Sequence, residues 1–388
     1  MKLLRVKANH FKNCSDDFTI DLVAKSRKTA EDKEYELLEI APGLYVYNTM
    51  AFIGKNASGK TSAIELMDMA YSILGDFRLE GKHYSYDGIE LEIVFWHEGW
   101  IYLYETKLET DNLGNRALFK NEALSCKKYY KTGLKRLFNR EEFERVFVYS
   151  IPFTSDDELD STLKKQLLLP EDVSRLFYVF RKKRVRALYF DSYEAGIDTY
   201  RLAFDAIRSY GIDAKILGKV LRIFDENVES LQMLDEKNYK LVFKGETKTI
   251  SDTQLIHLLS SGTTKGLLLY VLMVASLKEG FDLLIDEVEN HFHKTLVENM
   301  ISLYRDKNVN KRNATLIFTT HYCEVLDQMG RQDNIWICKS GSQVTLSNMY
   351  EDYHIRPELL KSKQYYNNAF RTAVDYGALM NLKGELMK

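Results

Sequence analysis

The segment 54–61 has a residue spacing that favours phosphate binding. It follows the pattern G-x-x-x-x-G-K-T, and its members are Gly54, Lys55, Asn56, Ala57, Ser58, Gly59, Lys60 and Thr61. A glycine at each end lets the backbone approach a phosphate closely, with the N–H groups of the loop as donors. We expect the Lys60 ammonium to contact the β- and γ-phosphates of ATP and the Thr61 hydroxyl to bind Mg²⁺.

A strand and a helix are predicted on the two sides of this loop. The apolar run 51–53 is expected to be a strand that ends at the loop. After the loop, apolar residues recur at helical spacing, at Ile64, Met67, Ala70, Tyr71 and Leu74. The phosphates would then lie at a helix N-terminus, where free N–H groups and the helix dipole favour anions. A chance glycine turn is the alternative, and the order of strand, loop and helix argues against it.

Two acidic residues follow a second predicted strand. The stretch FDLLIDE (281–287) is mostly apolar and ends in Asp286 and Glu287. An aspartate at such a strand end is a common Mg²⁺ partner beside a phosphate loop, and the next glutamate can deprotonate the attacking water. A helix N-terminus that favours acidic residues is the alternative. Together with the phosphate loop, the acidic pair predicts ATP hydrolysis.

Two further stretches have residues that suit contact with phosphate. In HLLSSGTTKGLLL (257–269), small residues precede an apolar helix; they are Ser260, Ser261, Gly262 and Thr263. They predict a second helix N-terminus that favours anions, although an ordinary helix cap has a similar composition. His321 ends the apolar strand expected in ATLIFTTH and is placed to touch a phosphate or the attacking water.

The remaining pattern predicts a mixed α/β protein. Antiparallel strands are expected near the N-terminus, including a hairpin over 88–109. Helical periodicity dominates 155–235, with Asp213 as one helix cap, and a short β pair is expected over 239–250. The last third alternates helices with apolar strands, which predicts a largely parallel, buried sheet.

Composition limits the classes of function. The chain has 388 residues and a formal net charge of −2, so no overall field attracts it to nucleic acid. Its four cysteines are scattered, without the pairs typical of zinc sites, which fits a reducing cytoplasm. We expect no signal peptide, and the longest apolar run, 266–277, is too short to span a bilayer. A cytoplasmic protein that does not bind membranes is therefore expected.

The four stretches, in this order along the chain, resemble those of the ABC-type ATPase superfamily. The sequence is most similar to the branch that contains SMC, RecF and OLD-family heads. Within that branch it resembles the stand-alone phage-defence ATPases of the RloA and AriA (PARIS-like) type. In such proteins LSSGTTKG matches the signature motif, LLIDEVE the second nucleotide motif, NHFH a dimer-contact loop and His321 the switch histidine.

The resemblance implies an ABC-type ATPase head with a mostly parallel core sheet, an antiparallel β lobe and an inserted helical lobe. The expected parts are an N-terminal ATPase lobe over 1–150, a helical insertion over 151–250 and a C-terminal ATPase lobe over 251–388. At least a homodimer is implied, because the signature of one subunit caps the γ-phosphate that the other subunit holds. ATP then closes the dimer, and hydrolysis removes the charge that held it closed.

The resemblance also assigns a role to each motif residue. Lys60 and Thr61 act in cis, Ser260, Ser261 and Gly262 in trans, Asp286 holds Mg²⁺, Glu287 is the catalytic base and His321 senses the γ-phosphate. One feature of the superfamily is missing, namely a glutamine after the strands of the first lobe that links Mg²⁺ to the helical lobe. The chain has no glutamine before Gln166, and His97 or Glu98 in the hairpin could substitute for it.

The sequence offers no second chemical centre. After His321 only 67 residues remain (388 − 321), without a recognisable nuclease pattern. We therefore expect an ATPase that senses invasion, through a phage protein or nucleic acid, and controls a separate toxin or nuclease effector. A RecF- or SMC-like repair ATPase that binds DNA directly is the alternative. The basic stretches 126–140 and 180–186 could each grip a phosphate backbone or be a solvated or partner-facing surface.

Overall fold

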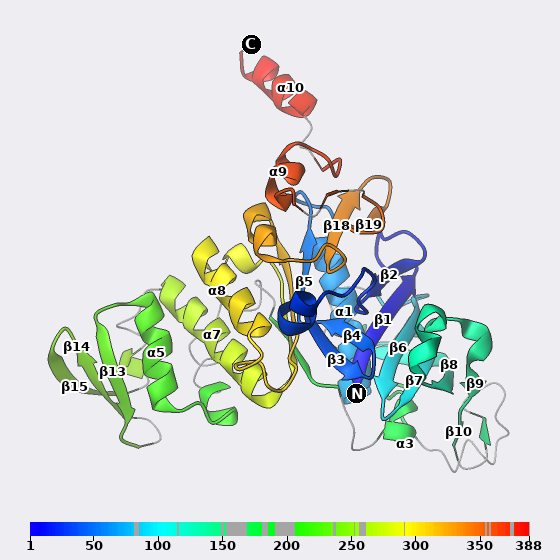
Figure 1. Ribbon diagram of the computed structural model, residues 1–388, viewed down its shortest axis with the longest axis horizontal. Helices are drawn as coiled ribbons and strands as arrows, with labels where there is room; N and C mark the ends of the chain where they lie inside the picture. The colour runs from blue at the N-terminus through cyan, green and yellow to red at the C-terminus, as the bar shows by residue number, and fades with distance from the viewer. Residues whose placement is uncertain are drawn as a thin grey trace. The chain divides into compact units, whose positions relative to one another are not determined.

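Figure 1 shows the computed structural model of the chain. It describes residues 1–388 except 81–84, 115, 149–150, 153–168, 181–184, 191–205, 236–237, 252, 256–260, 291, 354, 357, 373–375 and 388. Packing divides the chain into two compact units: unit 1 is Met1–Arg184 with Thr319–Lys388, and unit 2 is Val185–Phe318. Each unit is described by itself. The expected three-part division of the chain stays a prediction.

A six-stranded antiparallel sheet lies in unit 1. Its strand order is β2, β1, β6, β7, β8, β9. The strands are β1 (Lys2–Asn9), β2 (Phe18–Asp21), β6 (Glu90–His97), β7 (Trp100–Thr110), β8 (Ala117–Lys128) and β9 (Glu144–Arg145). The predicted hairpin is confirmed as β6 and β7, which turn at Glu98 and Gly99, both with positive φ.

A small hairpin and two short 3₁₀ helices pack against one face of this sheet. The hairpin is β3 (Leu37–Ala41) with β4 (Leu44–Tyr47), and the helices are η2 (Lys131–Arg136) and η3 (Arg140–Glu142). One hydrophobic cluster includes Leu38, Val46, Val94, Leu103 and Leu137. These residues come from the hairpin, from the sheet and from the end of η2, so burial of their apolar surface holds the three parts together.

The strand before the phosphate loop belongs to a second group of strands in unit 1. β5 (Thr49–Ile53) is parallel to β18 (Ile335–Ser340), which is antiparallel to β19 (Val344–Asn348). All five residues of β5 are buried, as in a strand covered on both faces. The predicted helix is confirmed as α1 (Lys60–Asp76), which buries all five apolar residues that define its periodicity.

Parallel strands also occur in unit 2. β12 (Ala187–Phe190) pairs with β16 (Asp282–Ile285), and β16 pairs with Leu316–Phe318 of β17 (Leu316–Thr320), both in parallel; the last two residues of β17 belong to unit 1. α7 (Ser261–Glu279) precedes β16, and α8 (Lys294–Arg305) precedes β17. The predicted alternation of helices and parallel strands is therefore confirmed, and the protein is of the mixed α/β class.

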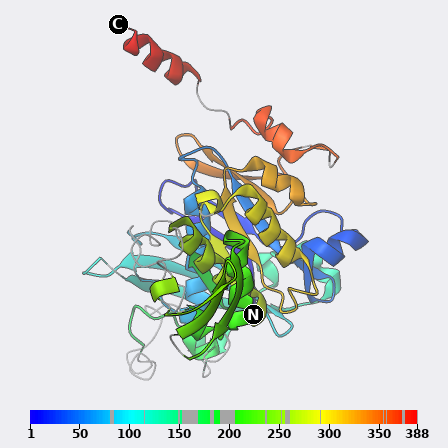
Figure 2. The same cartoon turned by 90° about the vertical axis from the view of Figure 1, so that its left-hand side faces the viewer.

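A three-stranded antiparallel sheet in unit 2 packs against a helix. β13 (Val228–Met233), β14 (Asn238–Phe243) and β15 (Glu246–Ser251) lie beside α5 (Ala214–Phe224), as the green part of Figure 2 shows. The predicted β pair is confirmed as β14 and β15. Asp213 caps α5 as predicted, because its carboxylate accepts a hydrogen bond from the Lys215 N–H at 2.9 Å.

The helical periodicity expected over 155–235 is wrong at two described places. Ala187–Phe190 is β12, because parallel pairing with β16 outweighs the local pattern. Val228–Met233 is β13 rather than a continuation of α5. The reason is a turn at Asp225, whose carboxylate accepts hydrogen bonds from the Asn227 N–H at 3.0 Å and side-chain amide at 2.7 Å.

The other elements are short. They are η1 (Asp32–Glu36), β10 (Phe147–Val148), β11 (Ile151–Pro152), α3 (Leu176–Phe180), η6 (Val288–Asn290), η7 (Cys323–Gln328), α9 (Lys361–Tyr366) and α10 (Tyr376–Leu386). In the described part of the chain, no helix is both long enough and apolar enough to cross a membrane.

Candidate nucleotide-binding site

The segment 54–61 forms a tight loop between β5 and α1. The Ser58 N–H donates to the Lys55 carbonyl at 3.2 Å, and Ala57 and Gly59 have left-handed backbone, with φ of 58° and 92°. Left-handed residues within such a turn direct successive N–H groups to one side, which favours an anion. Helix α1 begins at Lys60 and has no acidic residue in its first turn, so no carboxylate of that turn competes with a bound anion.

Packing explains why both glycines are needed. At Gly59, an added Cβ atom would lie 2.2 Å from Val344 Cγ1. At Gly54, an added Cβ atom would lie 2.3 Å from Ser58 Oγ and 2.6 Å from the Cys338 carbonyl oxygen. Any larger residue would therefore push the loop away from β18 and β19. The sequence did not indicate the contacts with Val344 and Cys338, because they join segments far apart in the chain.

Lys60 folds back over the loop and meets the predicted histidine. Its Nζ atom donates to the carbonyl oxygens of Gly54 and Lys55, both at 3.3 Å, and lies 2.9 Å from His321 Nε2. A lysine ammonium can only donate, so this contact needs an unprotonated Nε2 with the ring proton on Nδ1. Both residues belong to unit 1. The structure thus brings together two of the residues that the sequence singled out.

The remaining loop residues differ in exposure. The Ser58 hydroxyl is buried and has no hydrogen-bond partner within the described residues. Asn56 and Ala57 are exposed, and Thr61 lies in the first turn of α1. A buried hydroxyl without a partner is unfavourable, and a phosphate oxygen is an acceptor that would satisfy it. The loop therefore fits a phosphate group.

In unit 2, the predicted acidic pair directly follows β16. Asp286 is buried, and its N–H donates to the Phe190 carbonyl of β12 at 3.2 Å. Glu287 is partly exposed and has left-handed backbone with a φ of 48°, which is strained for a residue with a side chain. Its carboxylate accepts a hydrogen bond from the Asn290 side chain at 2.5 Å. Strained backbone of this kind is frequent at functional sites.

The predicted signature residues lie at the start of α7. Ser261, Gly262 and Thr263 are the first residues of this helix, whereas Ser260 lies outside the described residues. The predicted helix is confirmed from Ser261 onward, whereas its N-terminus and the role of that N-terminus stay predictions, because residues 256–260 lie outside the described ones. In the NHFH stretch, Phe292 is buried, and its ring centroid lies 5.3 Å from that of Tyr270 in α7.

The two residues suggested as substitutes for the missing glutamine lie at the turn of the β6–β7 hairpin. His97 is buried, its Nε2 atom is 3.7 Å from the Glu98 carboxylate, and its ring packs edge-to-face on Phe180 of α3 at 5.7 Å between centroids. Glu98 is exposed. The substitution stays a prediction. Of the two basic stretches, 180–186 lies largely outside the described residues.

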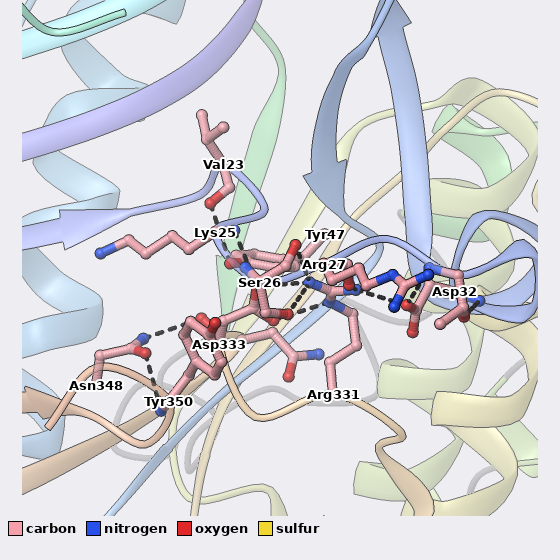
Figure 3. Close-up of polar contacts among 12 residues, drawn as sticks. Val23, Lys25, Ser26, Arg27, Asp32, Tyr47, Arg331, Asp333, Asn348 and Tyr350 are labelled. Atoms are coloured by element: carbon pink, nitrogen blue, oxygen red, sulfur yellow. Dashed lines mark hydrogen bonds and ion pairs between the residues drawn. The ribbon is translucent and has the colours of Figure 1, made fainter. Parts of the chain in front are cut away.

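A buried ion pair that the sequence did not reveal supports the strand beside the loop. Figure 3 shows the Asp333 carboxylate surrounded by donors. They are the N–H groups of Lys25 and Ser26, at 2.9 and 2.8 Å, and the Arg331 guanidinium, at 2.8 and 2.6 Å. Burial by itself would raise the pKa of the Asp333 carboxyl, but hydrogen bonding to and attraction by Arg331 outweigh it, so its pKa is lowered.

This ion pair has a direct connection to β5. Asn334, the residue after Asp333, accepts a hydrogen bond at its carbonyl from the Ala51 N–H at 3.1 Å. Its side chain donates to the Thr49 carbonyl, also at 3.1 Å. The ion pair therefore fixes the start of β18 against the strand that ends at the phosphate loop.

Comparison with known proteins agrees with this geometry. A buried strand, a glycine-bounded loop with a lysine, and a helix that starts at that lysine define a P-loop fold. Residues 50–327 match the family described as "AAA domain, putative AbiEii toxin, Type IV TA system", and the chain belongs to this family. At the family level the protein is therefore an ATPase.

Among solved structures, the chain is similar to an Smc head in a crystal structure with the C-winged helix domain of ScpA. The two sequences are 11% identical, the match covers 89% of this chain and 97% of the other, and the TM-score is 0.42. No curated protein matches the sequence. The fold class rests on the strand pairings described above.

Two predicted magnesium ligands have side-chain oxygens that suit the ion. Thr61 has a hydroxyl in the first turn of α1 in unit 1, and Asp286 has a buried carboxylate directly after β16 in unit 2; a site that they share stays a prediction. Mg²⁺ prefers oxygen ligands of this kind and usually combines one or two protein ligands with phosphate oxygens and water. In the described part of the chain, no group of three or more histidine, cysteine, aspartate or glutamate side chains could hold a metal by itself.

Proposed function

We propose that this protein binds ATP with Mg²⁺ at the loop 54–61 and hydrolyses it. The observation that carries the proposal is the position of the buried Lys60 ammonium, which lies between the loop carbonyls and His321. On binding, the β- and γ-phosphates would replace these weaker partners of Lys60, because a charge-assisted hydrogen bond to an anion is stronger than one to a carbonyl. His321 would then face the phosphate that Lys60 holds.

The acidic pair completes the proposed reaction. Asp286 and Thr61 would hold Mg²⁺, which when bound bridges phosphate oxygens and neutralises charge that develops during transfer. Glu287 would accept the proton of the attacking water, and its carboxylate is already oriented by the Asn290 side chain. Its strained backbone supports this role, because such strain persists where geometry matters for function.

The proposed active form is at least a homodimer with composite sites. In it, Ser260, Ser261, Gly262 and Thr263 of one subunit would cap the γ-phosphate held by the loop of the other subunit. The start of α7 supports this role, since a helix N-terminus favours anions. ATP would therefore stabilise the closed assembly, and hydrolysis would weaken it.

We further propose that the ATPase is the sensor or regulator of an anti-phage defence system in the cytoplasm. A phage protein or nucleic acid would be the trigger, and a separate toxin or nuclease would be the effector. The family description supports this role, because it names a putative toxin and a type IV toxin–antitoxin system.

Purification of the intact chain from its native host, before and after phage infection, tests the defence role. A toxin or nuclease that co-purifies and is released after infection, and that arrests growth when expressed without the ATPase, would support it. Recovery of the chain without such a protein, together with ATP hydrolysis stimulated by DNA duplexes, would instead favour the alternative of a repair ATPase.

A further inference from the structure

One end of the antiparallel sheet in unit 1 exposes a tryptophan beside a lysine. Trp100 is the first residue of β7, and it lies directly opposite Lys128, the last residue of β8. Residues that lie opposite each other in an antiparallel pair have their side chains on the same face. Trp100 is 40% exposed, and Lys128 is also exposed. This face of the sheet therefore ends in an accessible indole next to a cation.

A second exposed ring lies two residues further along the chain. Tyr130 is 60% exposed, and Lys128 Nζ is 5.8 Å from the centroid of its ring. The residue between them is anchored, because the Tyr129 hydroxyl donates to the Pro42 carbonyl at 3.0 Å and its ring packs against the hydrophobic cluster. Anchoring of Tyr129 leaves Tyr130 turned away from the cluster, where its ring is accessible to a ligand.

The charged groups near the two rings differ in their pairing, and they include the exposed Glu98 carboxylate in the turn before Trp100. Two nearby cations are neutralised by Glu142, which pairs with Lys127 at 3.1 Å and with Arg136 at 3.0 Å. By contrast, Lys128, on the face of Trp100, is exposed and has no ion pair within the described residues. The structure therefore separates Lys127 and Arg136, which are paired, from Lys128, which is available to an external anion.

We propose that this surface, formed by Trp100, Lys128 and Tyr130, binds single-stranded nucleic acid. Lysines suit the phosphate backbone, and exposed aromatic rings suit unstacked bases, whose faces any sequence presents. A duplex hides its base faces within the stack, and an acidic peptide would use the lysine without needing either ring. The surface goes beyond the proposed ATPase activity and does not depend on it.

Fluorescence anisotropy of the full chain with a labelled oligo(dT) of about 20 nucleotides, at about 50 mM salt, tests the proposal. We expect Tyr130→Ala to weaken binding about tenfold and Tyr130→Phe, which keeps the ring, to bind as the parent does. Lys128→Ala should lower the slope of log affinity against log salt by about 0.7, the value for one phosphate contact with a single strand.

Two matched controls remove equivalent groups elsewhere. Tyr350→Ala removes an exposed ring of unit 1, and Lys240→Ala removes an exposed lysine of unit 2, so both should bind like the parent. Circular dichroism of each variant checks the fold. Absence of oligo(dT) binding by the parent chain would overturn the proposal. So would equal affinity of parent, Tyr130→Ala and Lys128→Ala, or tighter binding of a duplex or of polyglutamate than of oligo(dT).

Discussion

The Lys60 ammonium lies 2.9 Å from His321 Nε2, although 261 residues separate the two in sequence. The contact joins the first residue of α1 to the residue that directly follows β17. It places a residue expected to hold phosphate beside one expected to sense it. Because Lys60 can only donate, His321 is its acceptor until an anion takes that place.

Glu287→Gln should separate nucleotide binding from hydrolysis. The amide keeps the size of the side chain but cannot accept a proton, so hydrolysis should fall by about 100-fold or more while ATP binding is retained. Phosphate release and ATP affinity, measured on the same preparation, check this expectation. Glu298→Gln, on the surface of α8, is the control and should hydrolyse ATP at the parent rate. Parent-like hydrolysis by Glu287→Gln would show that another group is the base.

Composite sites can be tested by mixing two inactive variants. Gly262→Asp adds bulk and negative charge where the partner's γ-phosphate is expected, a repulsion of several kcal/mol, on the order of that for an unpaired buried charge. The helix itself should tolerate the change, because aspartate is favourable in a first turn. Lys60→Ala removes the cation of the loop.

In a mixed dimer, one subunit would supply an intact loop and the other an intact signature. Hydrolysis should therefore reappear when the two variants are mixed and their subunits exchange. A mixture as inactive as its components, despite exchange shown by mass spectrometry or energy transfer, contradicts composite sites.

Asp333→Asn should destabilise unit 1 at neutral pH. Removal of one partner from a buried ion pair leaves the other uncompensated, at a cost of about 3–5 kcal/mol. The pKa of Asp333 is lowered by folding, so its contribution is complete above the unfolded pKa and is lost as the pH falls through the folded value. The difference between parent and variant should accordingly shrink in acid.

Urea denaturation at several pH values between neutral and about pH 2, below the unfolded pKa of an aspartate, measures this difference. Glu351→Gln is the control, because Glu351 pairs with Lys25 near the same ion pair but is half exposed. It should change stability by less than about 1 kcal/mol. A difference between parent and Asp333→Asn that grows toward acid would contradict the assigned pKa direction.

Local patterns predicted the elements that hold the candidate site. Strand β5, the loop and α1 were predictable because the glycines, Lys60 and the apolar spacing all lie within one short segment. The burial of β16 before Asp286 was predictable for the same reason. The prediction from sequence was wrong where pairing between distant segments determines the structure. Ala187–Phe190 was predicted to be helical and is a strand, because it pairs with β16.

The contacts that hold the phosphate loop in place could not be predicted from the sequence either. The contact of Gly59 with Val344 and the pairing of Arg331 with Asp333 near Ser26 depend on chain packing, which no spacing encodes. The basic stretch 126–140 shows the same limit, since only the structure separates its ion-paired cations from its exposed lysines.

Calorimetric titration with ATP and Mg²⁺ tests the central claim most directly. We expect the parent chain to bind ATP, and Lys60→Ala to lose binding by at least about 100-fold, because its ammonium is the cation at the head of the loop. Lys55→Ala is the matched control in the same loop, since Lys60 uses only the Lys55 carbonyl, and it should bind nearly as the parent does. Equal ATP affinity of the parent and Lys60→Ala would contradict the assignment of segment 54–61 as the nucleotide site.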